Sequence, residues 1–403
     1  MATVAVLGTL DTKGHEHAFL ASLVREQGHH AILIDVGTGG PPQVDPDITR
    51  ERVAAVGNID LDALLRRADR GECVAAMAAA APLMLGQLQR DGTIDAVISL
   101  GGGGGTSIAT AAMRALPVGF PKLMVSTLAS GNTAEYVGTK DIVMMPSIVD
   151  VSGLNRLSKT IFRQAAGAIC GMVAAGETVG DDQPLIVASM FGNTTECVNM
   201  ARKVLEDAGY EVLVFHATGT GGRAMEGLIE SGMAAGVLDI TTTEWADELV
   251  GGVLSAGPRR LDAAAAAGVP AVVVPGCLDM VNFGPRESIP SQFANRTFYV
   301  HNPQVTLMRT CASECAQLGR ILAEKLNAYT AATTLLLPRR AVSVISAPGQ
   351  PFHDPEADQS LFAALKDQLR SHIDIVEMDC DINDPEFARA CAAALLHNIA
   401  RAS

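Results

Sequence analysis

Short apolar runs alternate with amphipathic segments from the start of the chain. Residues 3–8 are apolar and predict a buried strand, and residues 15–27 carry apolar side chains at helical spacing. Gly28 ends this helix, and residues 31–35 are apolar again and predict a second strand. A strand, a helix and a strand in this order predict a βαβ unit, whose strands pair in parallel.

The same alternation continues as far as residue 175. Further apolar runs predict strands at residues 96–100, 122–126 and 141–145. Helices are expected over residues 69–89, over residues 155–175, and from the glycine run at residues 101–105 through Arg114. A polar linker at residues 176–184 then separates this half from the rest. We therefore expect a first domain over residues 1–180.

After the linker the pattern restarts with a strand, a helix and a strand, at residues 184–190, 194–208 and 211–216. Two segments of the first half also have counterparts in the second. Residues 33–40 (LIDVGTGG) align with residues 214–222 (VFHATGTGG), and residues 119–131 align with residues 268–280. Two matches in the same order predict an internal duplication.

The last 60 or so residues add two more strands and two more helices to the second half. We expect the strands at residues 343–346 and 374–378, and the helices at residues 360–369 and 385–399. These strands are predicted to extend the second sheet. The predicted fold is therefore α/β, with two Rossmann-like parallel-sheet halves related by internal duplication, and the second domain covers residues 181–403.

Composition and charge narrow the classes of function. The 403 residues are 48% hydrophobic, which is enough for two real cores and excludes a disordered chain. The net charge is −14 and no window is strongly basic, so we expect no nucleic-acid partner and no docking on anionic membranes.

Targeting signals are not apparent in the sequence. The N-terminus has no basic segment or cleavage signature, and the uncharged run at residues 74–86 is shorter than the ~18 residues of a membrane span. The eight cysteines are scattered and form no CxxC pair. We therefore expect a cytoplasmic protein whose cysteines are mostly buried apolar residues without disulfides.

Three loops of the first half follow strands and meet at the carboxyl edge of the predicted sheet, where ligands of open parallel sheets bind. These loops cover residues 9–14, 101–106 and 126–132. The glycine run opens a helix, whose free amides and dipole favour an anion, and its glycines can adopt positive φ. The candidate phosphate-binding residues of the last two loops are Gly101, Gly102, Gly103, Gly104, Gly105, Thr106, Ser126, Thr127, Ser130 and Gly131.

The first loop and the second strand add charged candidates. Lys13 can neutralise a phosphate, and Asp11 and Thr12 can hold Mg²⁺ directly or through water. Asp35 ends the second strand, where dinucleotide sites carry a ribose-binding acid. Neither GxGxxG at the first strand nor a Walker GxxxxGK[ST] occurs. A tightly packed glycine turn, a solvated lysine and a turn-forming aspartate therefore stay open as alternatives.

The corresponding positions of the second half are different. Thr241, Thr242, Thr243 and Glu244 stand where the first half has its glycine run, and His216 replaces Asp35. The second half is therefore not expected to bind the same triphosphate in the same way. It offers instead a candidate catalytic set of His216 as general base, with Asp279 and Glu244 as carboxylates, and Cys277 as an alternative nucleophile. The alternative is that these residues only hold loops together.

Five motifs in order resemble the Tm-one-like ATP-binding family, which includes the N-terminal region of a tomato mosaic virus resistance protein and bacterial members of uncharacterised function. The motifs are VAVLGTLDTKGHE (residues 4–16), ISLGGGGGT (98–106), LMVSTLASGN (123–132), FGNTTECV (191–198) and VPGCLDMVNFG (274–284). The resemblance implies a homodimer, and ATP with Mg²⁺ in the first half. Lys13, residues 101–104 and residues 126–131 match the family's nucleotide-contacting segments, and Arg70 is implied as a further contact.

Three functions are compatible with these residues. The first is an ATP-dependent enzyme whose second half holds a small acid or carbonyl metabolite. The second is a regulatory or protein-interaction module that binds ATP without hydrolysing it, and the lack of a Walker motif favours this alternative. The third is an NAD(P) enzyme, which Asp35 favours and the missing GxGxxG opposes.

Overall fold

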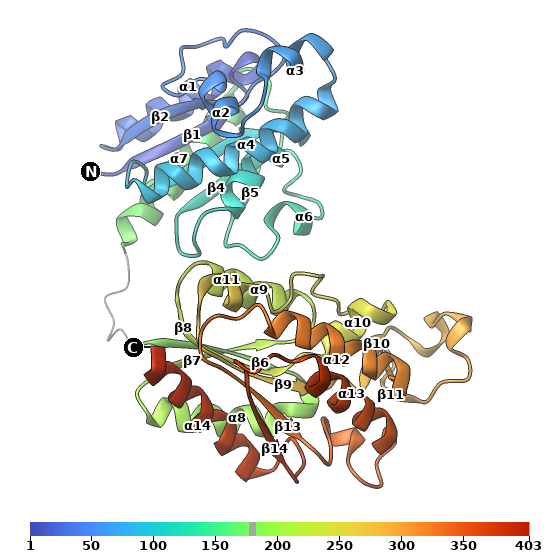
Figure 1. The fold of residues 1–403 in the computed structure, drawn as a ribbon. Coiled ribbons are helices and arrows are strands. Elements are labelled where there is room, and N and C mark those ends of the chain that lie inside the picture. Colours follow the sequence, from blue (N-terminus) through green and yellow to red (C-terminus); the bar gives the residue numbers. More distant parts are fainter. Residues whose placement is uncertain (177–182, 403) are drawn as a thin grey trace. The chain divides into compact units, whose positions relative to one another are not determined.

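A computed structural model describes residues 1–176 and 183–402 of the chain (Figure 1). The chain divides into two compact units, Met1–Val179 and Gly180–Ser403. Most of the predicted linker lies outside the described residues. We call the units the first and the second domain and describe each by itself.

The first domain is built on a five-stranded parallel sheet in the order β2-β1-β3-β4-β5. Every strand lies within two residues of its predicted position. Each is a short apolar run that ends at glycine, aspartate, serine or proline, as is typical of buried parallel strands. The strands are β1 (Thr3–Gly8), β2 (His30–Asp35), β3 (Ala96–Gly101), β4 (Lys122–Ser126) and β5 (Val143–Pro146).

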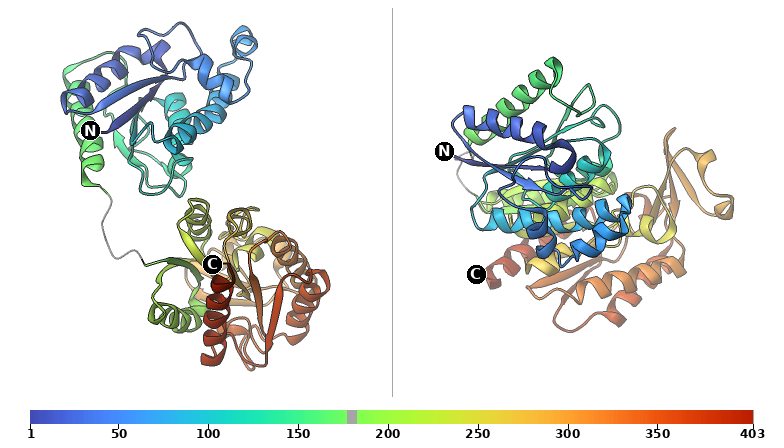
Figure 2. Two further views of the ribbon diagram at one scale, coloured as in Figure 1. Left: turned by 60° about the vertical axis from the view of Figure 1, so that its left-hand side comes forward. Right: turned by 90° about the horizontal axis from the view of Figure 1, so that it is seen from above.

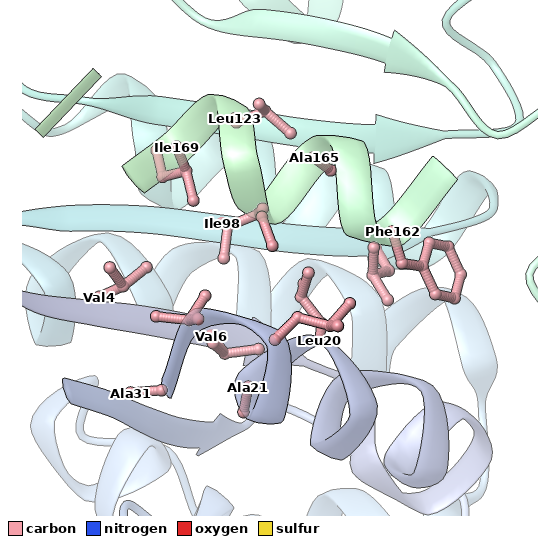
Figure 3. Close-up of a cluster of buried hydrophobic side chains, with 14 of the residues drawn as sticks. Val4, Val6, Leu20, Ala21, Ala31, Ile98, Leu123, Phe162, Ala165 and Ile169 are labelled. Atoms are coloured by element: carbon pink, nitrogen blue, oxygen red, sulfur yellow. The ribbon is translucent and has the colours of Figure 1, made fainter. Parts of the chain in front are cut away.

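Helices cover both faces of this sheet. Alternate residues of a strand point to opposite faces, so Val4 and Val6 pack with α1 and α7, whereas Ala5 and Leu7 pack with α4 and α5. Figure 3 shows the first of these two cores, with Leu20 of α1 and Phe162 of α7 facing the strands. The helices are α1 (Leu10–Glu26), α2 (Arg50–Val56), α3 (Leu61–Arg67), α4 (Arg70–Arg90), α5 (Gly103–Arg114), α6 (Ala134–Val137) and α7 (Arg156–Ala175).

Helix α1 begins five residues earlier than predicted, which corrects the expected loop at residues 9–14. Only Lys13, with φ −134° and ψ 29°, departs from helical geometry inside it. The glycine at position 14 obscured this start in the sequence, because glycine is a poor helix former. The short helices α2 and α3 were not predicted, since seven residues are too few for a clear helical period.

Helix α4 is longer than the uncharged run inside it. Its 21 residues meet the length and hydropathy of a membrane span, with a mean hydropathy of 1.3 in the most apolar window. In the sequence, the uncharged run at residues 74–86 had been judged too short for a membrane span. In the structure Met77, Met84 and Leu85 of α4 fill the core beneath the sheet, and a domain's core helix satisfies the same criterion.

The second domain has a six-stranded parallel sheet in the order β14-β13-β9-β8-β6-β7. Read from β7 to β13, this is the strand order of the first domain, which confirms two Rossmann-like halves of one architecture. The strands are β6 (Leu185–Met190), β7 (Glu211–His216), β8 (Ala234–Thr241), β9 (Ala271–Gly276), β13 (Thr333–Pro338) and β14 (Asp374–Met378). No strand was predicted at the positions of β8 and β13.

The helices of the second domain follow the same pattern, and α8 and α14 share one core with the sheet. They are α8 (Thr195–Asp207), α9 (Thr220–Glu230), α10 (Glu244–Val250), α11 (Ala263–Ala267), α12 (Ala312–Leu326), α13 (Pro355–Gln368) and α14 (Pro385–Ala402). Helix α13 begins five residues before its predicted start, where Asp354 caps it and Pro355 is its first residue.

Two further features of this domain differ from prediction. The expected strand at residues 343–346 is instead a 3-10 turn, Val344–Ser346, because Ser343 and Ser346 exchange side-chain and backbone hydrogen bonds. The sequence also did not predict a small antiparallel sheet in the order β10-β12-β11, seen at the edge of the second domain in Figure 2, although residues 297–300, at β11, are strand-like in sequence. Its strands are β10 (Met280–Phe283), β11 (Phe298–Asn302) and β12 (Val305–Arg309).

Candidate functional site

A pocket of about 820 Å³ opens at the carboxyl edge of the first sheet. The strand order reverses between β1 and β3, and the loops that follow these two strands both line the pocket. Such a reversal is where doubly wound sheets bind ligands, and the volume suits a small molecule. The lining residues predicted from the sequence are Asp11, Thr12, Lys13, Arg70, Gly102, Gly103, Gly104 and Gly105.

The start of α5 presents free amides to this pocket. Gly102 is the N-cap residue, and the amide of Thr106 makes the first helical hydrogen bond, 2.8 Å from the Gly102 carbonyl. Within the described part of the chain, the amides of residues 103–105 donate to no protein acceptor. Together with the helix dipole, three such amides form a site that favours an anion.

The glycines keep this helix end uncovered. The sequence suggested positive φ for them, but none of the five glycines has it. Among the described residues, a Cβ atom at Gly103 would meet no atom within 4 Å, and one at Gly104 would make ordinary contact with Val74 at 3.4 Å. Neither backbone conformation nor packing therefore requires glycine at position 103. What the absent side chain provides is direct access to the backbone amides.

The buried histidine His17 holds the backbone turn at Lys13 in place. The carbonyl of Lys13 lies 2.7 Å from His17 Nδ1, and the amide of Leu100 donates to His17 Nε2 at 3.4 Å. Burial lowers the pKa of His17, so its ring is neutral and Nδ1 carries the proton. His17 thus ties the Lys13 turn to the end of β3, next to the glycine run. The Lys13 ammonium donates to the Val151 carbonyl and keeps two further protons for a ligand.

Two aspartates hold the neighbouring turn at residues 37–40 in place. Asp11 Oδ2 accepts hydrogen bonds from the amides of Gly39 and Gly40. Asp35 Oδ1 accepts from the amides of Leu10 and Gly37, at 3.0 and 2.8 Å. Asp35 is 1% exposed and does not line the pocket. The structure therefore places it beneath the loops, where it positions them, rather than facing a ribose as expected.

Several other pocket residues were not predicted. Arg50, at the start of α2, lines the pocket and donates to the carbonyls of Gly37 and Gly40. Asp150 enters from the loop after β5. For Arg50 the only sequence signal was Thr49, whose side chain caps α2. The pocket is therefore lined by three cationic residues and two carboxylates. The cations are Lys13, Arg50 and Arg70, and the carboxylates are those of Asp11 and Asp150.

The remaining predicted residues of the first domain lie outside this pocket. The hydroxyls of Thr106 and Ser126 are buried and lie 2.7 Å apart. Thr127 and Ser130 line a second cavity of about 320 Å³, which shares Asp150 with the pocket. Gly101 and Gly131 line neither cavity.

In the second domain a carboxylate occupies the turn that corresponds to residues 37–40. Glu244 Oε1 accepts from the amides of Gly219 and Gly222, at 2.7 and 3.1 Å. A Cβ atom at Gly222 would lie only 2.2 Å from Glu244 Oε2. Glu244 thus holds this turn through backbone amides, as Asp11 holds the turn at residues 37–40 of the first domain.

Arg260 holds Glu244 in this position. The Arg260 side chain is 1% exposed and forms ion pairs with Asp239 and Glu244, both at 2.6 Å, and with Glu226 at 3.1 Å. Burial alone would lower the pKa of Arg260, but the carboxylates around it raise that pKa well above its ordinary value. One guanidinium therefore neutralises three buried carboxylates. Because Asp239, Glu226 and Glu244 lie on β8, α9 and α10, these ion pairs hold the three elements together.

The predicted catalytic set of the second domain is not assembled. In the described chain no hydrogen bond or ion pair joins His216, Asp279 and Glu244. His216 is exposed, with its ring edge-on to Phe191 at 5.4 Å. Asp279 is fully buried and accepts from the Ser343 hydroxyl at 2.7 Å, and burial raises its pKa to about 6. Burial also raises the pKa of the Cys277 thiol well above its ordinary value, which makes it a weak nucleophile.

The buried carboxyl group of Asp247 should make the stability of the second domain depend on pH. Asp247 accepts from the amide and the side chain of Asn282, yet burial raises its pKa from 3.8 to about 7. The folded state therefore keeps this proton longer than the unfolded state does. The free energy of unfolding should fall as pH rises from about 4 to 7, by up to about 4 kcal/mol from this group.

Replacing Asp247 with asparagine should remove this part of the slope. Urea unfolding followed by the fluorescence of Trp245, the single tryptophan, reports on the second domain. Asp207→Asn, at an exposed position of α8, is the control and should keep the slope of the parent. An equal pH slope in Asp247→Asn and the parent would contradict the assignment.

Family models match both domains. The N-terminal domain of the uncharacterised protein family UPF0261 matches residues 2–178, and the C-terminal domain of the same family matches residues 183–399. A UPF0261 protein of Clostridium tetani is 51% identical over 397 residues, which is 98% of each chain. A UPF0261 protein of Rhizobium meliloti is 48% identical over 396 residues, again 98% of each chain.

More distant relatives include a plant protein. The tomato (Solanum lycopersicum) ToMV resistance protein Tm-1 is 39% identical over 416 residues, and the match covers 98% of this chain but 55% of the tomato protein. Among solved structures, the thioesterase domain of a curacin biosynthetic pathway matches 54% of this chain and 92% of its own, with a TM-score of 0.28 and 13% identity. That likeness is too low to support any conclusion.

Proposed function

The chain belongs to the UPF0261 protein family, and from this premise we propose that its first domain binds ATP, with the phosphates at the start of α5. The observation that carries the proposal is the set of free amides at residues 103–105, which face a pocket of about 820 Å³. Lys13, Arg50 and Arg70 supply positive charge on the walls of the same pocket. Helix ends with free amides and cationic side chains of this kind bind phosphate groups in many α/β proteins.

The nucleotide in this proposal is ATP because the motifs of the first half resemble an ATP-binding family. Its phosphates would lie between α5 and the Lys13 turn, and the rest of the molecule would extend towards α2 and α4. Asp11 Oδ1 is buried and has no partner among the described residues, so it is the carboxylate oxygen suited to Mg²⁺ or to a water bound to it. The Mg²⁺, the homodimer and the cytoplasmic location stay predictions.

In this proposal the second domain does not hold the substrate. Glu244 is buried and pairs with Arg260, and Asp279 is fully buried and accepts a hydrogen bond from Ser343. A metabolite could reach either carboxylate only if the surrounding chain moved. We therefore propose that the chemistry, if ATP is turned over, takes place in the first domain.

Thermal unfolding with a panel of nucleotides and Mg²⁺ tests the proposal. A ligand that binds only the folded state stabilises it by about 2.7 kcal/mol at a hundredfold excess over Kd. ATP should raise the unfolding midpoint of the first domain. Lys13→Ala removes a charged donor and should weaken ATP binding by about 2 kcal/mol, or roughly 30-fold.

The matched control is Lys159→Ala, at an exposed position of α7 that does not line the pocket. It should respond to ATP like the parent. If no nucleotide shifts the parent, the domain is not a nucleotide-binding domain. A shift with NADH but not with ATP would favour a dinucleotide enzyme instead.

A further inference from the structure

A second cavity adjoins the candidate phosphate pocket. Its volume is about 320 Å³, and its walls come from the loops after β4 and β5. Asp150 lines both this cavity and the pocket. Thr127 also lies at the junction, because a Cβ atom on Gly102, the N-cap of α5, would be 3.7 Å from Thr127 Oγ1. A group in the second cavity would therefore lie next to whatever binds at the start of α5.

The loop that carries Asp150 is anchored on both sides. The Lys13 ammonium donates to the carbonyl of Val151, and the amide of Gly153 donates to Glu16. On the other side, the amide of Ser147 donates to the carbonyl of Ser126 at 3.1 Å. Ile148 has φ +63°, which is unfavourable for a β-branched residue and concentrates at functional sites. Asp150 is thus held at a fixed place relative to Lys13 and β4.

The polar groups of the cavity are available to a ligand. Throughout the described chain, no hydrogen bond or ion pair engages the carboxylate of Asp150 or the hydroxyls of Thr127 and Ser130. All three residues are exposed. A carboxylate repels an acid but accepts a hydrogen bond from an alcohol. Two hydroxyls and one carboxylate therefore suit a small molecule that carries hydroxyl groups.

We propose that this cavity is the acceptor subsite of a phosphotransferase, and that it holds a small alcohol beside the terminal phosphate of ATP. The inference rests on the proposed ATP site. The alcohol oxygen forms a bond to the terminal phosphorus, and the bond between that phosphorus and the bridging oxygen breaks. The bridging electron pair stays on ADP, and Asp150 takes the alcohol proton. The products are a phosphate ester and ADP, with the proton released later to solvent.

The test measures ADP formation by the full chain with Mg²⁺ and ATP, in water alone and with glycerol, ethylene glycol, erythritol or xylitol added. ATP binding is followed in parallel by thermal unfolding. The parent should form ADP, faster with at least one of these alcohols. Asp150→Asn should lower kcat roughly 100-fold or more, because general base catalysis is lost, and should not reduce the ATP-induced shift, because it removes a negative charge near the phosphates.

Two further variants separate catalysis from folding. Asp62→Asn removes an exposed carboxylate of α3 that lines neither cavity, and should keep the rate of the parent. Thr127→Val should raise KM for the alcohol without altering the ATP shift.

Each contrary result has its own meaning. If the parent does not bind ATP, the proposed function fails and the subsite fails with it. If the parent binds ATP but forms no ADP with water or any alcohol, only the subsite is overturned. Full activity in Asp150→Asn also overturns it. Loss of ATP binding in Asp150→Asn would make Asp150 part of the nucleotide or Mg²⁺ site and would contradict its role as base.

Discussion

Replacing Gly103 with aspartate should abolish ATP binding and leave the first domain at least as stable as before. A Cβ atom at this position meets no atom of the described residues outside its own helix within 4 Å, so the helix should still form with a side chain there. A carboxylate in the first turn also interacts favourably with the helix dipole. The same carboxylate would, however, lie within a few Å of the phosphates. Two like charges about 4 Å apart near a protein surface repel by about 4 kcal/mol, which is roughly a thousandfold in Kd.

Gly103→Asn is the matched control, because asparagine has the same size without the charge. It should lose only the part of the affinity that comes from steric crowding. Calorimetric titration of ATP into both variants, with thermal unfolding of the unliganded proteins, measures the two effects separately. If the aspartate and asparagine variants bind ATP equally well, the phosphates do not lie at the start of α5.

Replacing Arg260 with alanine should destabilise the second domain by about 3–5 kcal/mol. The change leaves Asp239, Glu244 and Glu226 buried without their cation, and an uncompensated buried charge is far more costly than a lost surface pair. It also releases the turn at residues 219–222, which Glu244 holds through two amides. Urea unfolding followed by the fluorescence of Trp245 measures the loss.

The neighbouring residue offers a control within the same turn. Arg259 is 78% exposed at its side chain and pairs with Glu230 on the surface. Arg259→Ala should therefore cost less than about 1 kcal/mol. Equal destabilisation by the two variants would show that the buried network does not hold this domain together.

The fold was largely predictable because its parallel strands are continuous apolar runs with clear ends. β1 and β7, for example, occupy their predicted residues. β13 was missed because it follows α12 after only six residues, and a short apolar run there cannot be told from a continuing helix by periodicity. The strand order was not predicted, since it depends on which strands pair rather than on any local pattern.

The candidate site was predictable as a set of loops but not as a set of side-chain directions. Lys13 and the glycine run follow β1 and β3, and parallel strands bring their carboxyl ends to one edge. Asp35 also ends a strand, yet its carboxylate turns inward to the amides of Leu10 and Gly37. Arg50 and Asp150 lie on segments without a strong sequence pattern, and only the folded chain brings them to the pocket.

Comparing the two duplicated halves indicated where their ligand-binding residues differ. The sequence indicated that Glu244 stands where the first half has glycines, and that the second half should not bind the same triphosphate in the same way. The structure adds a physical reason, because Glu244 places a buried carboxylate in the first turn of α10, where α5 of the first domain begins with glycines and has no acidic residue. The partner that holds it, Arg260, is 16 residues away in the chain and had no sequence signal.

Hydrogen exchange at individual amides tests the central claim most directly. The amides of residues 103–105 have no acceptor within the described protein and should exchange rapidly in the unliganded chain. Saturating ATP with Mg²⁺ should slow their exchange markedly, because the phosphate oxygens become their acceptors, while residues 241–244 of the second domain should be unaffected. ATP that binds and stabilises the chain without slowing exchange at residues 103–105 would contradict the account.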